Sequence, residues 1–206
     1  MQIKRTSNSG VLIMMDGVKI LFDGVSKALY PYNGTPDEIR RELEGDLPDI
    51  LAFTHMHDDH YDASFTEHYK KMTKRAVYSP ENVYSVETNA IKLEMIETRH
   101  IGKSDVPHVS YFLEGSKCVW FMGDASPTAL KKFENMKKPD VLIAPYSFAN
   151  TSLGWQVANE TGAEKIVILH LPDKANDEYD IWNMVFETAG NDMRLIIPNI
   201  GQTISI

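Results

Sequence analysis

The sequence predicts an α/β fold in which two β-sheets are flanked by helices. Three observations support this prediction. Paired strand-like runs open the chain, helices then alternate with short apolar runs, and the same theme returns in the second half. No low-complexity segment or linker separates the halves, so we expect one domain over residues 1–206.

The amino-terminal strands are predicted by short runs rich in β-branched residues, at Ile3–Thr6, Val11–Met15 and Val18–Phe22. Asp16-Gly17, between the last two runs, is the strongest short-range signal for a hairpin turn. The apolar run Asp49–Phe53, which ends at Thr54, predicts a further buried strand.

Two helices are predicted on either side of that buried strand. Thr35-Pro36-Asp37-Glu38 offers an N-cap threonine, a proline at the first helical position and a capping-box glutamate, and it predicts a helix to about Glu44. Asp62 is the expected cap of a second helix, which ends near Lys74.

The remaining elements follow from the same signals. Strands are expected at Ala76–Tyr78, Ile91–Thr98, Val109–Glu114, Lys117–Met122, Val141–Ala144, Ile166–Leu169, Leu195–Ile197 and Thr203–Ile206. Helices are expected after Ser79-Pro80, from Ser126-Pro127 to about Asn135, over Leu153–Thr161, and over Glu178–Ala189 with Asp177 as its cap.

Composition disfavours several classes of protein. Lys and Arg number 21 against 29 Asp and Glu, a net charge of −8, which argues against a binder of nucleic acid or of an anionic membrane. The single cysteine, Cys118, cannot form an internal disulfide and is expected to be a small buried hydrophobe. Residues 1–10 lack the apolar core of an export signal, and no apolar run is long enough to span a membrane. We therefore expect a cytoplasmic protein with a small-molecule substrate, and make no prediction of its oligomeric state.

Three of the seven histidines fall within Thr54-His55-Met56-His57-Asp58-Asp59-His60, directly after the buried strand. Residues two apart on a strand point the same way, which places His55 and His57 on one side as the chain leaves the sheet. Imidazoles grouped with carboxylates are ligands for Zn²⁺ or a similar cation. The alternative is an exposed polar loop, and the position directly after a buried strand disfavours it.

The run His55-x-His57-x-Asp59-His60 resembles the signature of the metallo-β-lactamase-fold metallohydrolases. Members of that family carry further ligands at the carboxyl ends of strands, and the chain supplies His100, Asp124 and His170 in the matching order. The resemblance implies a four-layer αββα sandwich of two mixed β-sheets flanked by helices.

The resemblance also implies a dinuclear centre that holds two Zn²⁺ ions, with Mn²⁺ or Fe as alternatives. The first metal would take His55, His57 and His100, and the second would take Asp59, His60 and His170. Asp124 would bridge the two. His108 also stands just before a strand and is an alternative to His100, which is favoured because it ends one.

The expected function is hydrolysis of a small ester, lactone or phosphodiester by a metal-activated bridging water. Asp59 is the expected catalytic residue that orients this water or accepts its proton, and His108, Tyr61 and Tyr146 are candidate proton donors. Two alternatives remain: a non-catalytic metal or ligand sensor on the same fold, and an iron-dependent redox enzyme.

Three other side chains receive predicted roles from the sequence, and one is expected to have none. Asp23, by the resemblance, would lie beneath the metals and orient a ligating imidazole, although it also fits a turn before glycine. Asn150 and Lys174, together with Tyr146, are expected to shape the substrate pocket. His68 lies within a helical pattern and is expected to have no role.

Overall fold

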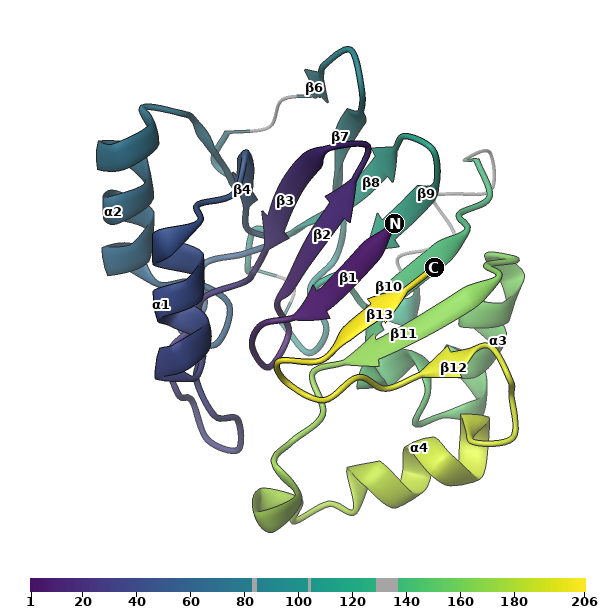
Figure 1. Cartoon of the computed structure of the whole chain (residues 1–206). Coiled ribbons are helices and arrows are strands. Elements are labelled where there is room, and N and C mark those ends of the chain that lie inside the picture. The colour runs from purple at the N-terminus through teal and green to yellow at the C-terminus, as the bar shows by residue number, and fades with distance from the viewer. Residues whose placement is uncertain (83–84, 104, 129–136) are drawn as a thin grey trace.

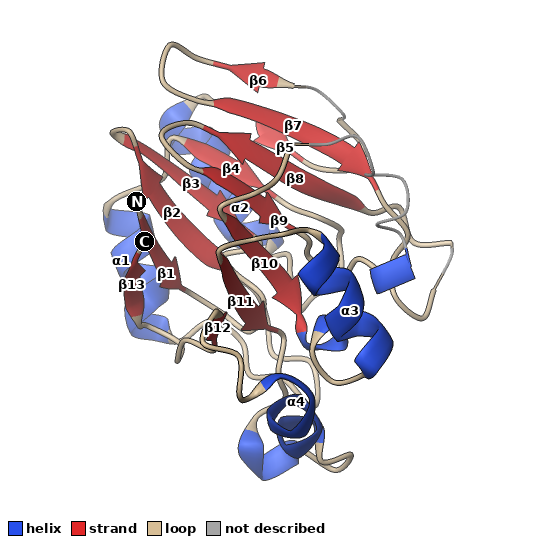
Figure 2. Ribbon diagram, turned by 90° about the vertical axis from the view of Figure 1, so that its right-hand side faces the viewer, coloured by secondary structure: helices blue, strands red, loops and turns tan. Residues whose placement is uncertain are grey.

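Two β-sheets stack face to face, and helices cover both outer faces (Figures 1 and 2). The structure is a computed structural model that describes residues 1–82, 85–103, 105–128 and 137–206. Helices α1 (Asp37–Gly45) and α2 (Ala63–Thr73) cover one sheet, and α3 (Ser152–Glu160) and α4 (Ile181–Ala189) cover the other. This arrangement confirms the predicted four-layer αββα sandwich.

The first sheet has the strand order β13-β1-β2-β3-β4-β5. Its strands are β1 (Gln2–Arg5), β2 (Val11–Met15), β3 (Val18–Phe22), β4 (Ile50–Ala52), β5 (Val77–Tyr78) and β13 (Thr203–Ser205). The pairs on the β13 side of β3 are antiparallel, whereas β3, β4 and β5 are parallel. The two ends of the chain lie side by side, since the Met1 amino group donates to the Ile206 carbonyl at 3.1 Å.

The second sheet has the order β12-β11-β10-β9-β8-β7-β6. Its strands are β6 (Val86–Glu87), β7 (Lys92–Glu97), β8 (Val109–Glu114), β9 (Cys118–Phe121), β10 (Val141–Pro145), β11 (Lys165–Leu169) and β12 (Leu195–Ile196). From β6 to β9 the pairs are antiparallel, and from β9 to β12 they are parallel. Both sheets are therefore mixed, as expected.

Alternation along the strands divides the apolar residues between layers. In β2, Ile13 faces the core between the sheets, whereas Leu12 packs under α1 and α2. In β9, Val119 faces the central core, whereas Cys118 and Trp120 pack with the helices of the other face. Because both faces are covered, the strands read as continuous apolar runs in the sequence, and Cys118 is buried as predicted.

Most predicted elements are present, and the β2–β3 turn is confirmed in detail. Asp16 and Gly17 have φ values of 52° and 80°, as a type I′ hairpin turn requires. The predicted cap of α1 is wrong: the Thr35 hydroxyl accepts from the Ser26 amide at 2.9 Å, and the helix begins after Pro36 without a side-chain cap. The Thr35 hydroxyl therefore bonds to Ser26 and does not cap the helix, as the local sequence pattern had predicted that it would.

Three other expectations differ from the structure or lie outside it. No helix begins at Ser79 within the described residues 79–82, which form a turn closed by a Ser79–Asn82 bridge. Helix α4 begins at Ile181, later than predicted, although both carboxylate oxygens of Asp177 accept amides from its first turn. The helix predicted from Ser126 to about Asn135 falls mostly on residues 129–136, which lie outside the described residues.

Backbone hydrogen bonds bring the loops at one end of the sandwich together. The Val109 amide donates to the Thr54 carbonyl at 2.9 Å and so joins the second sheet to the segment that precedes the histidine motif. The His170 amide donates to the Asn8 carbonyl at 3.1 Å and joins the end of β11 to the β1–β2 loop. In the part of the chain that the structure describes, no helix is long and apolar enough to cross a membrane.

Candidate metal centre

Six histidine and aspartate side chains that follow strand ends converge with Asp124 at one end of the sandwich. They form three groups whose ligand atoms lie within 4.8 Å of one another: His55, His57 and His100; Asp59, His60 and His170; and His55, His60 and Asp124. The structure thus brings together all seven residues that the sequence nominated as ligands. That these residues bind metal stays a prediction.

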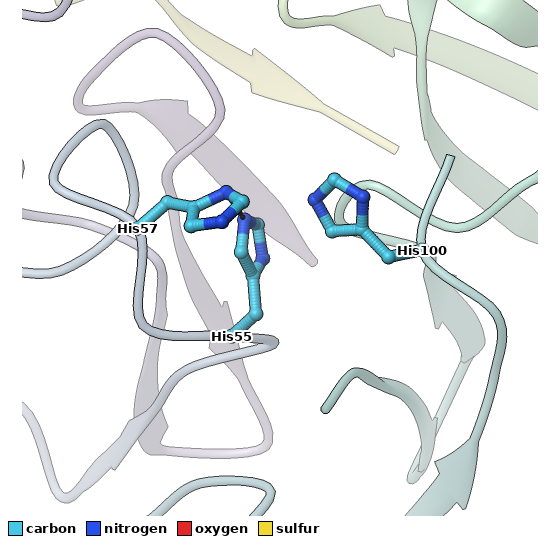
Figure 3. A group of neighbouring side chains, drawn as sticks. All are labelled: His55, His57 and His100. Atoms are coloured by element: carbon cyan, nitrogen blue, oxygen red, sulfur yellow. Dashed lines mark hydrogen bonds between the residues drawn. The ribbon is translucent and has the colours of Figure 1, made fainter. Parts of the chain in front are cut away.

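The first group consists of three imidazoles (Figure 3). Nε2 of His55 lies 3.0 Å from Nδ1 of His57, and the His100 ring reaches toward both from the loop after β7. The His55 and His100 ring centroids are 4.7 Å apart. Three nitrogen donors in this arrangement match the ligand set of a zinc-type cation.

The second group combines two imidazoles with a carboxylate. Nε2 of His60 lies 3.1 Å from Nε2 of His170, and Oδ2 of Asp59 lies 3.2 Å from the same His170 nitrogen. His170 has a φ of 61°, a left-handed conformation that is unfavourable outside glycine and turns. The strained backbone at the end of β11 is consistent with a functional position.

Asp124 lies between the two groups. Its Oδ1 is 3.3 Å from Nε2 of both His60 and His170, and its Oδ2 is 3.7 Å from Nε2 of His100. One carboxylate oxygen therefore faces each group. This is the placement of a carboxylate that bridges two cations.

Hydrogen bonds at the outer ring nitrogens show that the cluster fits metal ligation. Nδ1 of His100 donates to the Ile101 carbonyl at 2.5 Å, and within the described residues Nε2 of His100 is buried without a hydrogen-bond partner. Oδ1 of Asp124 is likewise buried, and among the described groups it has the two 3.3 Å ion-pair contacts with His60 and His170 but no hydrogen bond. Buried polar atoms without partners are costly, and a coordinated cation would satisfy both.

Asp23 organises two of the imidazoles from beneath. Its carboxylate accepts the Thr54 amide and the Thr54 hydroxyl, each at 2.7 Å, and contacts Nδ1 of His60 at 2.8 Å. The Thr54 hydroxyl in turn lies 3.1 Å from Nδ1 of His55. These contacts place the N–H of both imidazoles at Nδ1 and leave Nε2 for ligation, the role that the sequence suggested for Asp23.

The protonation of the cluster reflects its buried carboxylates. Burial alone would lower the pKa of His60, but Asp124 and Asp23 raise it well above its ordinary value. Burial also lowers the pKa of His170, but Asp124 and Asp59 outweigh it and raise that pKa to about 9. By contrast, burial depresses the pKa of His55. The buried carboxylates thus favour the protonated forms of His60 and His170, and a bound divalent cation would displace those protons.

His108 lies beside the cluster with both ring nitrogens engaged. Its Nδ1 lies 2.7 Å from the Thr98 hydroxyl, and its Nε2 accepts the Asp124 amide at 3.1 Å. Burial lowers its pKa to about 3. This geometry favours His100 over His108 as the ligand, and it counts against His108 as the proton donor that the sequence suggested. The contact with Asp124 instead indicates a positioning role.

The two tyrosines considered as proton donors lie in different surroundings, and His68 lies outside the cluster. Tyr61 is partly buried and packs edge-on against Phe53 at a centroid distance of 5.0 Å, at the border of the core beneath α1 and α2. Tyr146, at the start of the short helix η2 (Tyr146–Phe148), lies 6.3 Å from the His170 ring. His68 is part of α2 and belongs to none of the three groups.

Tyr32 is a neighbour of the cluster that sequence reasoning missed. Its ring meets the His170 ring edge-on at a centroid distance of 4.3 Å, and Tyr146 lies beside the same imidazole. Burial is the main cause that raises the pKa of both phenols. Tyr32 comes from the irregular segment between β3 and α1, where no periodicity or motif marks it.

The family model of the beta-lactamase superfamily domain matches residues 2–167 of the chain. The chain belongs to this superfamily. The matched range contains six of the seven candidate ligands, and His170 lies just beyond it. The resemblance inferred from the histidine motif is therefore confirmed. Comparison with curated proteins gives no significant match.

Solved structures share the fold at low sequence identity. A possible metal-dependent hydrolase from Veillonella parvula DSM 2008 has a TM-score of 0.70 and 16% identity, with 100% of this chain and 99% of that chain covered. An isothiocyanate hydrolase from Delia radicum gut bacteria has a TM-score of 0.69 and 12% identity at the same coverage. CmlA, a diiron β-hydroxylase from Streptomyces venezuelae, has a TM-score of 0.64 and 11% identity, with 100% of this chain and 54% of that chain covered. At these identities the likeness establishes the fold.

Proposed function

We propose that the chain is a dinuclear metal-dependent hydrolase that acts on a small ester, lactone or phosphodiester. The observation that supports this most directly is the position of Asp124, whose two carboxylate oxygens face His100 on one side and His60 with His170 on the other. A single three-ligand site would not need a carboxylate between two groups.

Bound divalent cations supply Lewis-acid chemistry and lower the pKa of water toward neutrality. His55, His57 and His100 would hold one cation, and Asp59, His60 and His170 the other, with Asp124 shared. Asp59 is only 4% exposed and presents Oδ2 to the cluster beside His170. It is placed to orient an attacking water and to accept its proton.

The rim of the cluster favours a substrate with an apolar portion. Met56, between two ligand histidines, is 41% exposed, and Ile101, directly after His100, is 37% exposed. Tyr32 and Tyr146 add two half-buried rings beside His170. Apolar side chains with a few convergent polar groups are typical of small-molecule sites.

The proposed metal is zinc, because a histidine-rich set with carboxylates suits it. The same ligands also accept manganese and iron, and the fold neighbour CmlA is a diiron enzyme. Elemental analysis of protein purified without chelator or added metal distinguishes these. An iron-loaded protein without hydrolytic activity would favour the redox alternative.

The test combines metal content with a panel of aryl ester, lactone and aryl phosphodiester substrates. We expect about two metal ions per chain and metal-dependent hydrolysis of one substrate class. Asp124→Ala and His57→Ala should lose both metal and activity, whereas His68→Ala, on α2, should retain both. A metal-loaded protein that is silent on the whole panel would contradict the proposal and favour a metal or ligand sensor.

A further inference from the structure

A cavity of about 370 Å³ lies beside the candidate metal centre, next to the segment after His170, and none of the candidate ligands lines it. The β1–β2 loop, the segment that follows His170, α4 and the turn before β13 contribute to its walls. It is lined by Arg5, Asn8, Asn33, Leu171, Pro172, Asp173, Lys174, Trp182, Asn199 and Ile200. Its volume is in the range of small-molecule sites.

Arg5 brings a buried positive charge to this cavity. The residue is 5% exposed, and within the described part of the chain its guanidinium donates to the main-chain carbonyls of Ser7, Asn8 and Pro198 at 2.9 to 3.0 Å. Among the described residues, no carboxylate lies within ion-pair distance of it. A buried cation without a counter-charge is costly, so the cavity it lines favours an anion.

Asn8 supplies a buried donor without a partner. The residue is 2% exposed, and its Nδ2 makes no hydrogen bond with any group in the described part of the chain. Its carbonyl accepts from both Arg5 and the amide of His170, so the backbone of Asn8 is fixed. Asn8 and Arg5 both line this cavity.

The carboxylate in the wall is already satisfied. Oδ2 of Asp173 accepts from Nδ2 of Asn33 at 2.7 Å, and Oδ1 accepts the Ala175 amide at 2.9 Å. Lys174 adds a second positive charge, with Nζ held 4.7 Å from the centre of the Trp182 ring. The charged residues of the lining are thus Arg5 and Lys174 against Asp173, a net charge of +1.

We propose that this cavity binds a small organic anion, a carboxylate or phosphate group attached to an apolar or aromatic body. Arg5 and Asn8 would hold the anionic group, since a charged acceptor strengthens each hydrogen bond. The apolar body would contact Trp182, Leu171 and Ile200. At the exposed side of the cavity, the positive charge of Lys174 would help to neutralise the anion. The site is distinct from the metal centre and is joined to it through the Asn8–His170 backbone contact.

The test measures binding to the metal-loaded protein by isothermal titration calorimetry, with benzoate, phenyl phosphate and the uncharged control benzyl alcohol. The variants below separate binding in this cavity from binding at the metal centre. We expect saturable binding of one anion per chain by benzoate, phenyl phosphate or both, and none by benzyl alcohol. The stronger of the two anions identifies the preferred head group. Binding by neither would overturn the proposal.

Variants locate the bound anion. Asn8→Asp keeps the side-chain shape but replaces the free donor with a carboxylate, and it should weaken binding more than about tenfold. Lys174→Glu alters an exposed residue and remains informative if Asn8→Asp does not fold; it should also weaken binding, whereas Lys70→Ala, on α2, should not. Unchanged affinity in Lys174→Glu and in folded Asn8→Asp would place the anion elsewhere and contradict the proposal.

Discussion

Asp23 and His60 meet through a contact of 2.8 Å between Oδ2 of the carboxylate and Nδ1 of the imidazole, and both side chains are fully buried. The same carboxylate accepts two hydrogen bonds from Thr54. It therefore fixes the orientation of His60 and, through the Thr54 hydroxyl, that of His55. One buried carboxylate links both halves of the candidate dinuclear centre without being a ligand.

Asp23→Asn should weaken metal binding by about 10- to 100-fold, because the amide can no longer accept all three hydrogen bonds. Asparagine tolerates the left-handed backbone at this position, where φ is 47°, so the fold should persist. Competition with a chelator of known affinity measures the change. Asp37→Asn, at the exposed start of α1, is the matched control. Equal affinity in the two variants would contradict the positioning role.

Gly123→Ala should unfold or strongly destabilise the protein. Gly123 has a φ of +52°, and an added Cβ would lie 2.4 Å from Oγ1 of Thr54, which its bond to Asp23 prevents from moving. We expect a loss of about 2 kcal/mol or more in the free energy of unfolding, together with loss of metal. Gly45→Ala, where a Cβ would meet nothing within 4 Å, should be nearly neutral. Chemical denaturation measures the free energy of unfolding of both variants. Similar values would contradict the expected clash between Thr54 and a Cβ at position 123.

The layers of the sandwich could be predicted from the sequence because their signals are local. Apolar runs marked the strands, and Asp16-Gly17 marked the hairpin. Thr35 shows where local signals fail: its hydroxyl fits a helix cap, yet it bonds to Ser26, nine residues earlier. Competition between local and long-range partners cannot be read from spacing.

The candidate site likewise contains residues that the sequence predicted and residues that it did not. The histidine motif and the residues after strand ends carry the ligand set, because strand ends meet at one edge of a sheet. Tyr32 and Asn8 lie in irregular loops, and their closeness to His170 depends on how those loops fold over the sandwich. No sequence pattern records such contacts, so both residues were missed.

Metal removal should lower thermal stability, because metal binds the folded chain and the ligands are scattered in the unfolded one. At a free metal concentration of about 100 times Kd, the folded state gains about 2.7 kcal/mol per site. We expect Tm to rise with added Zn²⁺ in the wild type and in His68→Ala, and the rise to be smaller in Asp124→Ala. Thermal melts across a zinc series test this, and an equal zinc response in Asp124→Ala would contradict the ligand assignment.

His108→Ala distinguishes a positioning role from proton donation. The substitution leaves the buried Asp124 amide without an acceptor, which should cost about 1–3 kcal/mol in the free energy of unfolding and weaken metal binding. The shape of the pH–rate profile should be retained, because the imidazole already has partners at both nitrogens. Loss of one limb of that profile, with metal affinity intact, would instead favour the catalytic role.

Tyr32→Phe and Tyr146→Phe should each reduce kcat/KM about 3- to 10-fold on the substrate class identified by the panel, the effect of one lost hydrogen bond. Metal content should not change, since neither phenol belongs to the ligand groups. Because both rings lie beside the His170 imidazole, the double variant should lose less than the product of the single effects. Tyr179→Phe, with its ring 77% exposed, controls for the substitution itself. Full additivity, or unchanged kinetics in both single variants, would show that the two phenols do not act together on the substrate.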